Sequence, residues 1–496
     1  MNTIYGILLL SFAVELLLFF QKPWTYRNHI VWLLLGMYAV TAIMLLRTGS
    51  HPYTFFALLV LAFRAINIVR LLYGRRHESH IKNIIRRSLL WLIGLQFLSA
   101  LLTLITESNV NLVILYLSST QFLSAGLLLG FIVHSVHQTR FDGHSAFLSD
   151  KELPSITVAI PARNETQDLA SCIESILGTN YPKLEVLVLD DCSQDKTPDI
   201  IKHYAHAGVR FLEGSEPKKD WLAKNQAYQQ LATEANGSYI VFCGVDVRMA
   251  PDYLRNLVTH TIVKKKNMVS VLPLRLGGDI RSSFIQPMRY WWELALPRKF
   301  LNRPAVLSTC WIIKKKTLLD LGSFNAVRRN ILPERYFARE CVAQEAYGLV
   351  RSNEKLDLRT VKSPHAQFLT SIRVRYPQFQ KRPENILILT VVLQILLFMP
   401  YLLFALTFFV DMPEVRVISA TTIAMLALAH AIIISVSNPA NSLIALVNFP
   451  FVIMSETILT MYSMLQYEFG KIMWKGRNVC IPVHLGSISL PRLRRR

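Results

Sequence analysis

The chain has 496 residues, of which 52% are hydrophobic and 18% charged, and its mean hydropathy is +0.32. Soluble domains usually carry about a quarter charged residues, so this composition excludes a disordered, a fibrous and a purely soluble protein. The 54 Lys and Arg against 33 Asp and Glu give a formal net charge of +21. Such an excess fits nucleic acid, anionic lipid or an anionic substrate. In a membrane protein it also follows from the Lys and Arg that gather in cytoplasmic loops, so we expect no nucleic-acid partner.

The first 135 residues consist mainly of apolar runs. Each run approaches the roughly 20 residues that a helix needs to cross a bilayer. The runs lie at about 4–20, 29–46, 53–73, 89–106 and 111–134. The basic loops fall between alternate runs, so the positive-inside rule places them, and everything after residue 135, in the cytoplasm. We therefore predict a multi-pass protein of the cell membrane, with an N-terminal membrane domain of about five transmembrane helices at residues 1–135.

Residues 150–380 have a different character, since charge returns and Pro and Gly interrupt short apolar runs. Four of these runs read as buried strands, at 156–160, 184–190, 209–213 and 238–244, with helix-like segments between them. Strands that alternate with helices predict an α/β domain with a doubly wound, mostly parallel sheet. We expect one cytoplasmic domain of catalytic size in this region.

Apolar segments return after residue 380. They lie at about 386–410, 416–436 and 443–465, and together form C-terminal membrane segments over 386–466. Three crossings would leave the basic tail at 467–496 outside the cell, whereas the positive-inside rule places that tail inside. We therefore expect two or three crossings, with one segment re-entrant or interfacial. The α/β domain is then inserted between two bundles of membrane helices.

Polar residues follow the predicted strands where a nucleotide could bind. Glu165 follows the first strand, Asp190 ends the second, and Asp246 follows the fourth. In open α/β sheets ligands bind beyond the carboxyl ends of the strands, where a carboxylate can bind a ribose or help hold Mg²⁺. Lys224, at a loop-to-helix junction, suits a phosphate. Each motif alone also fits an ordinary turn, a helix cap or a solvated lysine.

The order and spacing of these blocks resemble family-2 glycosyltransferases with the GT-A fold, which typically read VPARNE, VDDGSTDGT, GWxGKNxA and FxDADVxxxP. The matching stretches begin at Pro161, Leu189, Lys219 and Phe242. Two further stretches, Thr309–Phe324 and Met473–Arg477, look like GGCMLVRREALExxGGF and TWRGR. They are most similar to the membrane subgroup that acts on carotenoid, hopanoid or related lipid acceptors. The resemblance covers about residues 154–480.

The resemblance implies a role for each polar residue. Asp190 and Glu165 would contact the nucleoside of a nucleotide-sugar donor, expected to be a UDP-sugar, and Lys224 would meet its diphosphate. Asp246 would hold the divalent cation, Mg²⁺ or Mn²⁺, bound to that diphosphate. The chain departs from the family's D-x-D pattern because Gly244 stands in place of the first Asp. One metal ligand of the pair therefore remains.

The family's catalytic base is an Asp in the pattern EDxxLAR, and Glu334 stands at that position here. Inversion at an anomeric carbon passes through an oxocarbenium-like state and needs a carboxylate opposite the leaving group to take the acceptor proton. Glu340 and Glu345 are the fallback candidates. The alternative is that Glu334 is simply an acid at a helix N-terminus, where the helix dipole favours negative charge.

Polysaccharide synthases of the same fold carry Q-x-x-R-W near the membrane. The nearest match here is Ile372–Tyr376, in which Arg375 would neutralise the leaving diphosphate and Tyr376 would line the acceptor entrance. The missing Gln and Trp argue against a processive polymerase. As an alternative, Arg373 and Arg375 contact lipid headgroups.

Three function classes follow from these observations. The leading one is a membrane-embedded inverting glycosyltransferase that moves a sugar from a nucleotide sugar to a lipid or isoprenoid acceptor at the cytoplasmic face. The second is a catalytically degenerate relative that acts as an assembly partner, which Gly244 and Pro333 motivate. The third is a polysaccharide synthase or exporter, which the number of helices motivates and the weak Q-x-x-R-W match opposes.

Overall fold

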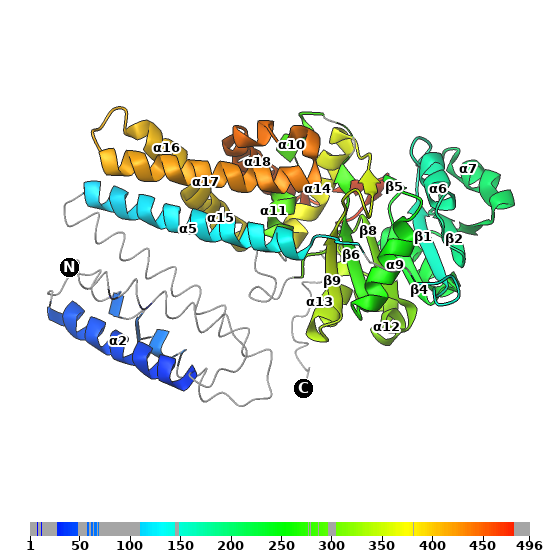
Figure 1. Cartoon of the computed structure of the whole chain (residues 1–496), viewed down its shortest axis with the longest axis horizontal. Helices are drawn as coiled ribbons and strands as arrows, with labels where there is room; N and C mark the ends of the chain where they lie inside the picture. The colour runs from blue at the N-terminus through cyan, green and yellow to red at the C-terminus, as the bar shows by residue number, and fades with distance from the viewer. Residues whose placement is uncertain are drawn as a thin grey trace, which may run out of the picture. The chain divides into compact units, whose positions relative to one another are not determined.

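The structure is a computed structural model of the whole chain (Figure 1). It describes residues 27–47, 110–143, 148–295 and 304–480 apart from 276, 278, 286 and 380, together with isolated helical positions at 7, 11 and between 57 and 68. The expected spans at 4–20, 53–73 and 89–106 and the last 16 residues of the tail lie wholly or mostly outside the described residues. The chain divides into two compact units, Met1–Thr120 with Asp411–Val415, and Gln121–Val410 with Arg416–Arg496.

The first unit is described mainly by helix α2 (Arg27–Arg47). This helix coincides with the expected span at 29–46. Its buried Tyr38 ring lies 5.0 Å from the guanidinium of Arg64, which is itself buried. A cation over an aromatic face is a favourable way to bury a charge in an apolar unit.

The second unit is built on a seven-stranded sheet with the order β3-β2-β1-β4-β8-β6-β9. The strands are β1 (Ile156–Ala162), β2 (Leu184–Asp190), β3 (Val209–Glu213), β4 (Tyr239–Cys243), β6 (Met268–Leu272), β8 (Cys310–Lys314) and β9 (Tyr347–Arg351). Every neighbouring pair is parallel except those of β8, which runs antiparallel to β4 and β6. The prediction of a mostly parallel α/β sheet is confirmed, and so are its four expected strands.

Helices cover both faces of this sheet, as the alternation of side chains along the strands requires. On β1, Val158 and Ile160 join one hydrophobic cluster, whereas Ala159 joins the cluster on the opposite face. The first cluster includes residues of α6 (Leu169–Leu177), α7 (Thr197–His203) and α9 (Tyr253–Val263), and the second includes residues of α8 (Ala223–Glu234), α12 (Lys315–Asp320) and α13 (Glu334–Ala343). Short 3-10 turns follow α7 at Tyr204–Ala207 and α12 at Ser323–Val327. The sheet is therefore doubly wound.

Two small sheets lie beside the main one. Strand β10 (Leu358–Thr360) pairs with β5 (Val247–Met249) on one side and β7 (Leu274–Arg275) on the other. Near the end of the described chain, β11 (Met473–Trp474) and β12 (Arg477–Asn478) form a hairpin. Neither feature was predicted from the sequence, because strands of two or three residues carry no alternation pattern.

The remaining helices pack beside the α/β domain. They are α5 (Val110–Gln138), α10 (Ser282–Ile285), α11 (Pro287–Leu294), α14 (Pro364–Gln378), α15 (Pro383–Leu393), α16 (Met399–Leu406), α17 (Pro413–Ser437) and α18 (Phe449–Glu468). A π-helical turn at Gln394–Phe398 joins α15 to α16, and 3-10 turns at Pro439–Asn441 and Ile444–Leu446 precede α18. Residues of α5, α11, α15, α17 and α18 share one hydrophobic cluster, and α5, α15 and α17 run side by side in Figure 1.

Within the described residues, three helices are long and apolar enough to cross a membrane, at 113–138, 383–406 and 413–437. They coincide with the expected spans at 111–134, 386–410 and 416–436. The third C-terminal segment, at 443–465, differs, since it contains a 3-10 turn and most of α18, which packs against α10, α11 and α14. Helix α18 also carries a buried acid, Glu456, which an ordinary transmembrane helix would rarely contain.

Candidate active site

The carboxyl ends of β1, β2 and β4 meet at one edge of the sheet because these strands are parallel neighbours. This arrangement brings Glu165, Asp190 and Asp246 to that edge, as the sequence predicted for strand ends. The charges of Glu165 and Asp246 are close enough to interact. An acidic edge of this kind suits a ligand that brings hydroxyl groups or a cation.

Asp190 is buried at the last position of β2. Its Oδ2 accepts a hydrogen bond from the backbone N–H of Ser193 at 3.2 Å, whereas Oδ1 has no partner among the described residues. Gly214 packs directly against Asp190. A side chain at position 214 would collide with the carbonyl oxygen of Asp190, so a glycine is needed there. A buried carboxylate oxygen without a partner costs free energy, so this atom is poised for a donor that a ligand supplies.

Glu165 pairs with a residue of the C-terminal hairpin, which lies outside the α/β domain in the sequence. Its Oε1 lies 3.0 Å from Nζ of Lys475, which also donates to the carbonyl oxygen of Asn164 at 3.0 Å. Burial raises the pKa of the Glu165 carboxyl above its ordinary value, and the charge of Lys475 opposes that rise. In this structure the carboxylate therefore binds the hairpin of the C-terminal segment.

The neighbouring Asp191 is also engaged by the hairpin. Its Oδ1 lies 2.7 Å from NH1 of Arg477, whose NH2 lies 3.2 Å from Glu216. Arg163 donates to the carbonyl oxygens of Asp191 and Cys192. The ends of β1 and β2 are thus fastened to residues almost 300 positions further along the chain.

A side chain at position 244 would require the Asp246 side chain to shift. A side chain at Gly244 would approach Oδ1 of Asp246 to 2.6 Å, closer than non-bonded atoms allow. Oδ2 accepts a hydrogen bond from Thr360 at 3.3 Å and lies 3.9 Å from Nζ of Lys362. Across the described residues, no group of three or more His, Cys, Asp or Glu side chains is placed to hold a metal ion. A single carboxylate nevertheless fits Mg²⁺, which is commonly held by one or two carboxylates together with substrate phosphates.

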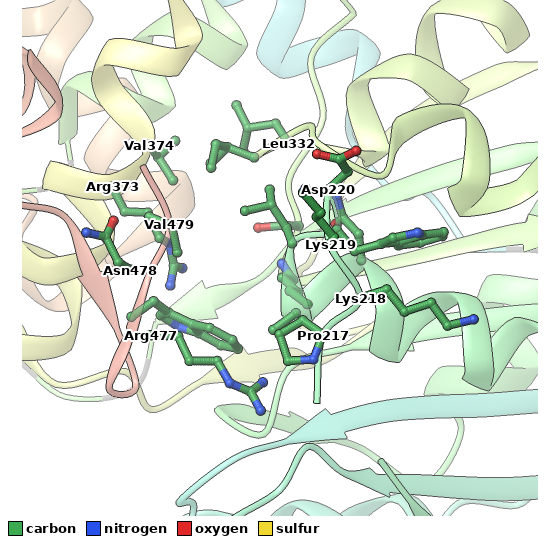
Figure 2. Close-up of a pocket in the computed structure, with 18 residues that line it drawn as sticks. Pro217, Lys218, Lys219, Asp220, Leu332, Arg373, Val374, Arg477, Asn478 and Val479 are labelled. Carbon is green, nitrogen blue, oxygen red and sulfur yellow. The ribbon is translucent and has the colours of Figure 1, made fainter. Parts of the chain in front are cut away.

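A cavity of about 320 Å³ opens beside α8 (Figure 2). Lys224, in the first turn of α8, lines it, and its Nζ lies 5.1 Å from the centre of the Tyr228 ring. Figure 2 shows Lys218 and Lys219 on one side, and Arg373 and Arg477 on the other. Apolar side chains complete the wall, including Trp221, Leu222, Ile331, Leu332, Val374 and Val479. The structure therefore places Lys224 in a cavity that is lined by further basic side chains and has an apolar part.

Glu334 is the first residue of α13 and is 1% exposed. Its Oε2 has no partner among the described residues. It follows the cavity-lining Leu332 by two positions without lining the cavity itself. Of the fallback candidates, Glu340 lies near the other end of α13 and pairs with Arg339 at 3.4 Å, whereas Glu345 follows the helix and is exposed.

Arg375 has a different environment from the predicted one. It is buried, and its Nε donates to Oε2 of Glu456 at 3.0 Å, while NH2 donates to the carbonyl oxygen of Ile285 at 2.8 Å. Tyr376 is buried as well, with its hydroxyl bound to Glu468. Arg373, two residues earlier on α14, lines the cavity instead.

Sequence reasoning missed the contribution of the hairpin. Trp474 and Arg477 line the cavity, and the guanidinium of Arg373 lies 5.4 Å from the centre of the Trp474 ring. The signal was present, since Met473–Arg477 was singled out as a motif. No pattern in it, however, indicates that it pairs with the ends of β1 and β2.

Comparison with known proteins agrees with this geometry. Residues 157–322, which contain β1, β2, β4 and the acidic edge, match the family model for glycosyl transferase family 2. The chain therefore carries a family-2 glycosyltransferase domain, and the class predicted from the sequence is confirmed.

Relatives of known name match the same region. The 4,4'-diaponeurosporenoate glycosyltransferase of Staphylococcus aureus strain bovine RF122 / ET3-1 is 29% identical over 132 residues, which are 26% of this chain and 34% of that protein. The enzyme of the same name from strain USA300 is 28% identical over a stretch of the same length. The chain thus spans about a third of the length of the curated relatives it matches.

Solved structures of glycosyltransferases also align. The mannosyltransferase PcManGT from Pyrobaculum calidifontis, in complex with GDP-Man and Mn²⁺, gives a TM-score of 0.43 at 16% identity, covering 71% of this chain and 98% of that one. TarS residues 1–349 from S. aureus, in complex with UDP-GlcNAc, gives 0.31 at 12% identity, covering 64% and 92%.

Proposed function

We propose that this chain is an inverting glycosyltransferase of the cell membrane, which moves a sugar from a nucleoside-diphosphate donor to a lipid or isoprenoid acceptor at the cytoplasmic face. One observation carries the proposal. Within the family-2 domain, the acidic edge formed by Asp190 and Asp246 lies at the carboxyl ends of parallel strands, and a basic cavity with Lys224 opens in the same compact unit. Carboxylates for a ribose or a cation and ammonium groups for phosphates are what a nucleotide sugar needs.

The donor, expected to be a UDP-sugar, would bind with its nucleoside near Asp190 and its diphosphate near Lys224. The unpartnered Oδ1 of Asp190 would accept a hydrogen bond from the nucleoside. A divalent cation, when bound, would be held by Asp246 and the phosphate oxygens and would offset the charge of the leaving group. Lys362, 3.9 Å from Asp246, adds a fixed positive charge on the same side.

Glu334 would act as the base of the transfer. Its unpartnered Oε2 would take the proton of the acceptor hydroxyl while that oxygen forms the new bond to the anomeric carbon. The bond from that carbon to the diphosphate breaks in the same step, and the nucleoside diphosphate leaves. Attack opposite the leaving group inverts the anomeric configuration.

A lipid acceptor is supported by the apolar helices in the same compact unit. Three described helices are apolar and long enough to cross a bilayer, and α5, α15 and α17 pack into one cluster with α11 and α18. The relatives at 28–29% identity are named for an apolar carotenoid acid, which agrees with an acceptor dissolved in the membrane. We place the domain at 150–380 and the basic tail in the cytoplasm on the charge of the loops.

Release of nucleoside diphosphate from a panel of nucleotide sugars tests the proposal. The purified wild type with Mg²⁺ or Mn²⁺ should hydrolyse or transfer from at least one donor. Asp246→Asn should lower both the turnover and its dependence on the cation, because it removes the carboxylate that we assign to the metal. A wild type that consumes no donor in the presence of membrane lipid would favour the non-catalytic assembly partner instead.

A further inference from the structure

The cavity beside α8 holds more positive than negative charge. Among the described residues, five basic side chains line it, namely Lys218, Lys219, Lys224, Arg373 and Arg477, and one acidic side chain, Asp220. Oδ1 of Asp220 lies 2.5 Å from NH2 of Arg329, so this acid is already neutralised from outside the cavity. Cations that line one cavity create a positive potential there, which attracts an anion.

The hairpin β11–β12 forms one wall of this cavity and is fastened on both strands. On β11, Trp474 lies beneath the guanidinium of Arg373, while in the turn the carbonyl oxygen of Lys475 accepts from Nε of Arg163 at 2.9 Å. Nζ of Lys475 pairs with Glu165. On β12, Arg477 pairs with Asp191. These contacts order the hairpin against β1 and β2 before any ligand arrives, which lowers the entropic cost of binding.

The two carboxylate partners of Arg477 differ sharply in exposure. The side chain of Asp191 is 5% exposed, whereas that of Glu216 is 76% exposed. A buried partner fixes the orientation of the guanidinium, while an exposed ion pair contributes only about 0–1 kcal/mol and exchanges easily. A phosphate can therefore replace Glu216 on NH2 while Asp191 keeps NH1. The planar fork of Arg suits this bidentate sharing.

We propose that Arg477 is a phosphate-binding residue of the donor site, supplied by the C-terminal hairpin, and that the donor's diphosphate displaces Glu216 from it. This inference rests on the proposed function. It assigns the contact with the donor's diphosphate to Arg477, whereas the sequence motif predicted Arg375 for that contact. Glu165 and Asp191 then serve as anchors of the hairpin.

Calorimetric titration tests this assignment, using UDP and GDP with uridine and guanosine as phosphate-free controls. Arg477→Gln should weaken binding of the diphosphate by about 10–100-fold, the scale of a lost charge-assisted hydrogen bond, and leave the nucleoside unchanged. Arg477→Lys should recover part of the affinity. Glu216→Gln should bind the diphosphate as tightly as wild type or tighter, because it removes the competing carboxylate. Arg210→Gln is the matched control, since Arg210 also bridges two carboxylates, Glu185 and Glu234, outside the cavity.

The outcomes separate the two levels of the proposal. Wild type that binds neither diphosphate overturns the proposed function and this inference with it. Wild type that binds one of them while Arg477→Gln binds equally well overturns the inference alone. An equal loss of diphosphate and nucleoside in Arg477→Gln shows a merely structural role and also overturns it. If Arg477→Gln does not fold, Arg477→Lys and Glu216→Gln decide, because loss of affinity in Glu216→Gln contradicts displacement.

Discussion

Glu334 is a buried carboxylate whose Oε2 has no partner among the described residues. Such an atom is expensive to leave unmatched, and native proteins keep few of them. A helix N-terminus explains why an acid is tolerated at this position, and it does not explain why one oxygen stays without a donor. The role of proton acceptor that we propose for Glu334 is consistent with both observations.

We expect Glu334→Gln to leave nucleoside-diphosphate binding nearly unchanged and to reduce sugar transfer by about 10²–10⁴-fold, the usual scale for a lost general base. Initial rates of transfer, measured alongside calorimetry, separate these two effects. Glu340→Gln is the matched control on the same helix and should keep full activity. If Glu340→Gln or Glu345→Gln loses activity while Glu334→Gln keeps it, the base has been placed wrongly.

Asp191 provides a pH-dependent test of the anchored hairpin. Its pKa is raised, because burial outweighs the opposing contacts with Arg477 and Arg163. A carboxyl whose pKa is higher in the folded than in the unfolded state contributes stability at low pH that is lost as the pH rises through the folded pKa. The apparent melting temperature of wild type minus that of Asp191→Asn should therefore fall as the pH is raised from about 4 to 7. A difference that grows with pH would show that Arg477 outweighs burial.

At the scale of the elements, a buried ion pair joins α14 to α18. Arg375 and Glu456 have side chains that are 6% and 4% exposed, and Trp292 donates to the other oxygen of Glu456 at 3.5 Å. Removing one partner of such a pair leaves a buried charge without compensation. Together with the hydrogen bond from the Tyr467 hydroxyl to the carbonyl oxygen of Arg373, the pair thus helps to hold α14 against α18.

Glu456→Ala should destabilise the protein by about 3–5 kcal/mol, the range for breaking a buried pair. Glu384→Ala is the control, because Glu384 pairs with Arg382 at 4.0 Å with both side chains more than half exposed, and such pairs contribute about 0–1 kcal/mol. Thermal unfolding in detergent compares the two variants. Equal melting temperatures would contradict a structural role for the Arg375–Glu456 pair.

The orientation of the two arginines on α14 could not be predicted from the sequence. Arg373 and Arg375 are two residues apart, so they point about 200° apart around the helix. The motif match predicts Arg375, but the packing of α14 decides which of the two arginines faces the cavity. In the structure Arg373 lines the cavity.

The strands β1 to β4 could be predicted because each is a short apolar run between turn residues. The hairpin could not, since its partners Glu165 and Asp191 lie about 300 residues earlier.

At the scale of the whole molecule, the glycosyltransferase class could be predicted because its motifs fall at strand ends, where topology alone brings them together. Placing Asp190 and Asp246 near strand ends and Lys224 at a helix start needed no knowledge of side-chain packing, and their roles stay predictions. The basic cavity could not be predicted without knowledge of side-chain packing, because its walls come from the loop before α8, from helix α14 and from the C-terminal hairpin. In the described part of the chain, the C-terminal hairpin thus pairs with the acidic edge of the sheet.

Transfer of a sugar from a nucleotide donor to a membrane lipid can be measured directly. Purified protein, reconstituted with membrane-lipid extract, is incubated with a panel of radiolabelled UDP- and GDP-sugars, and label is counted in the lipid fraction. Our account predicts labelled lipid from at least one donor with wild type, and a fall of about 10²–10⁴-fold with Glu334→Gln. Cleavage of no donor and no labelled lipid from wild type across the panel would contradict it.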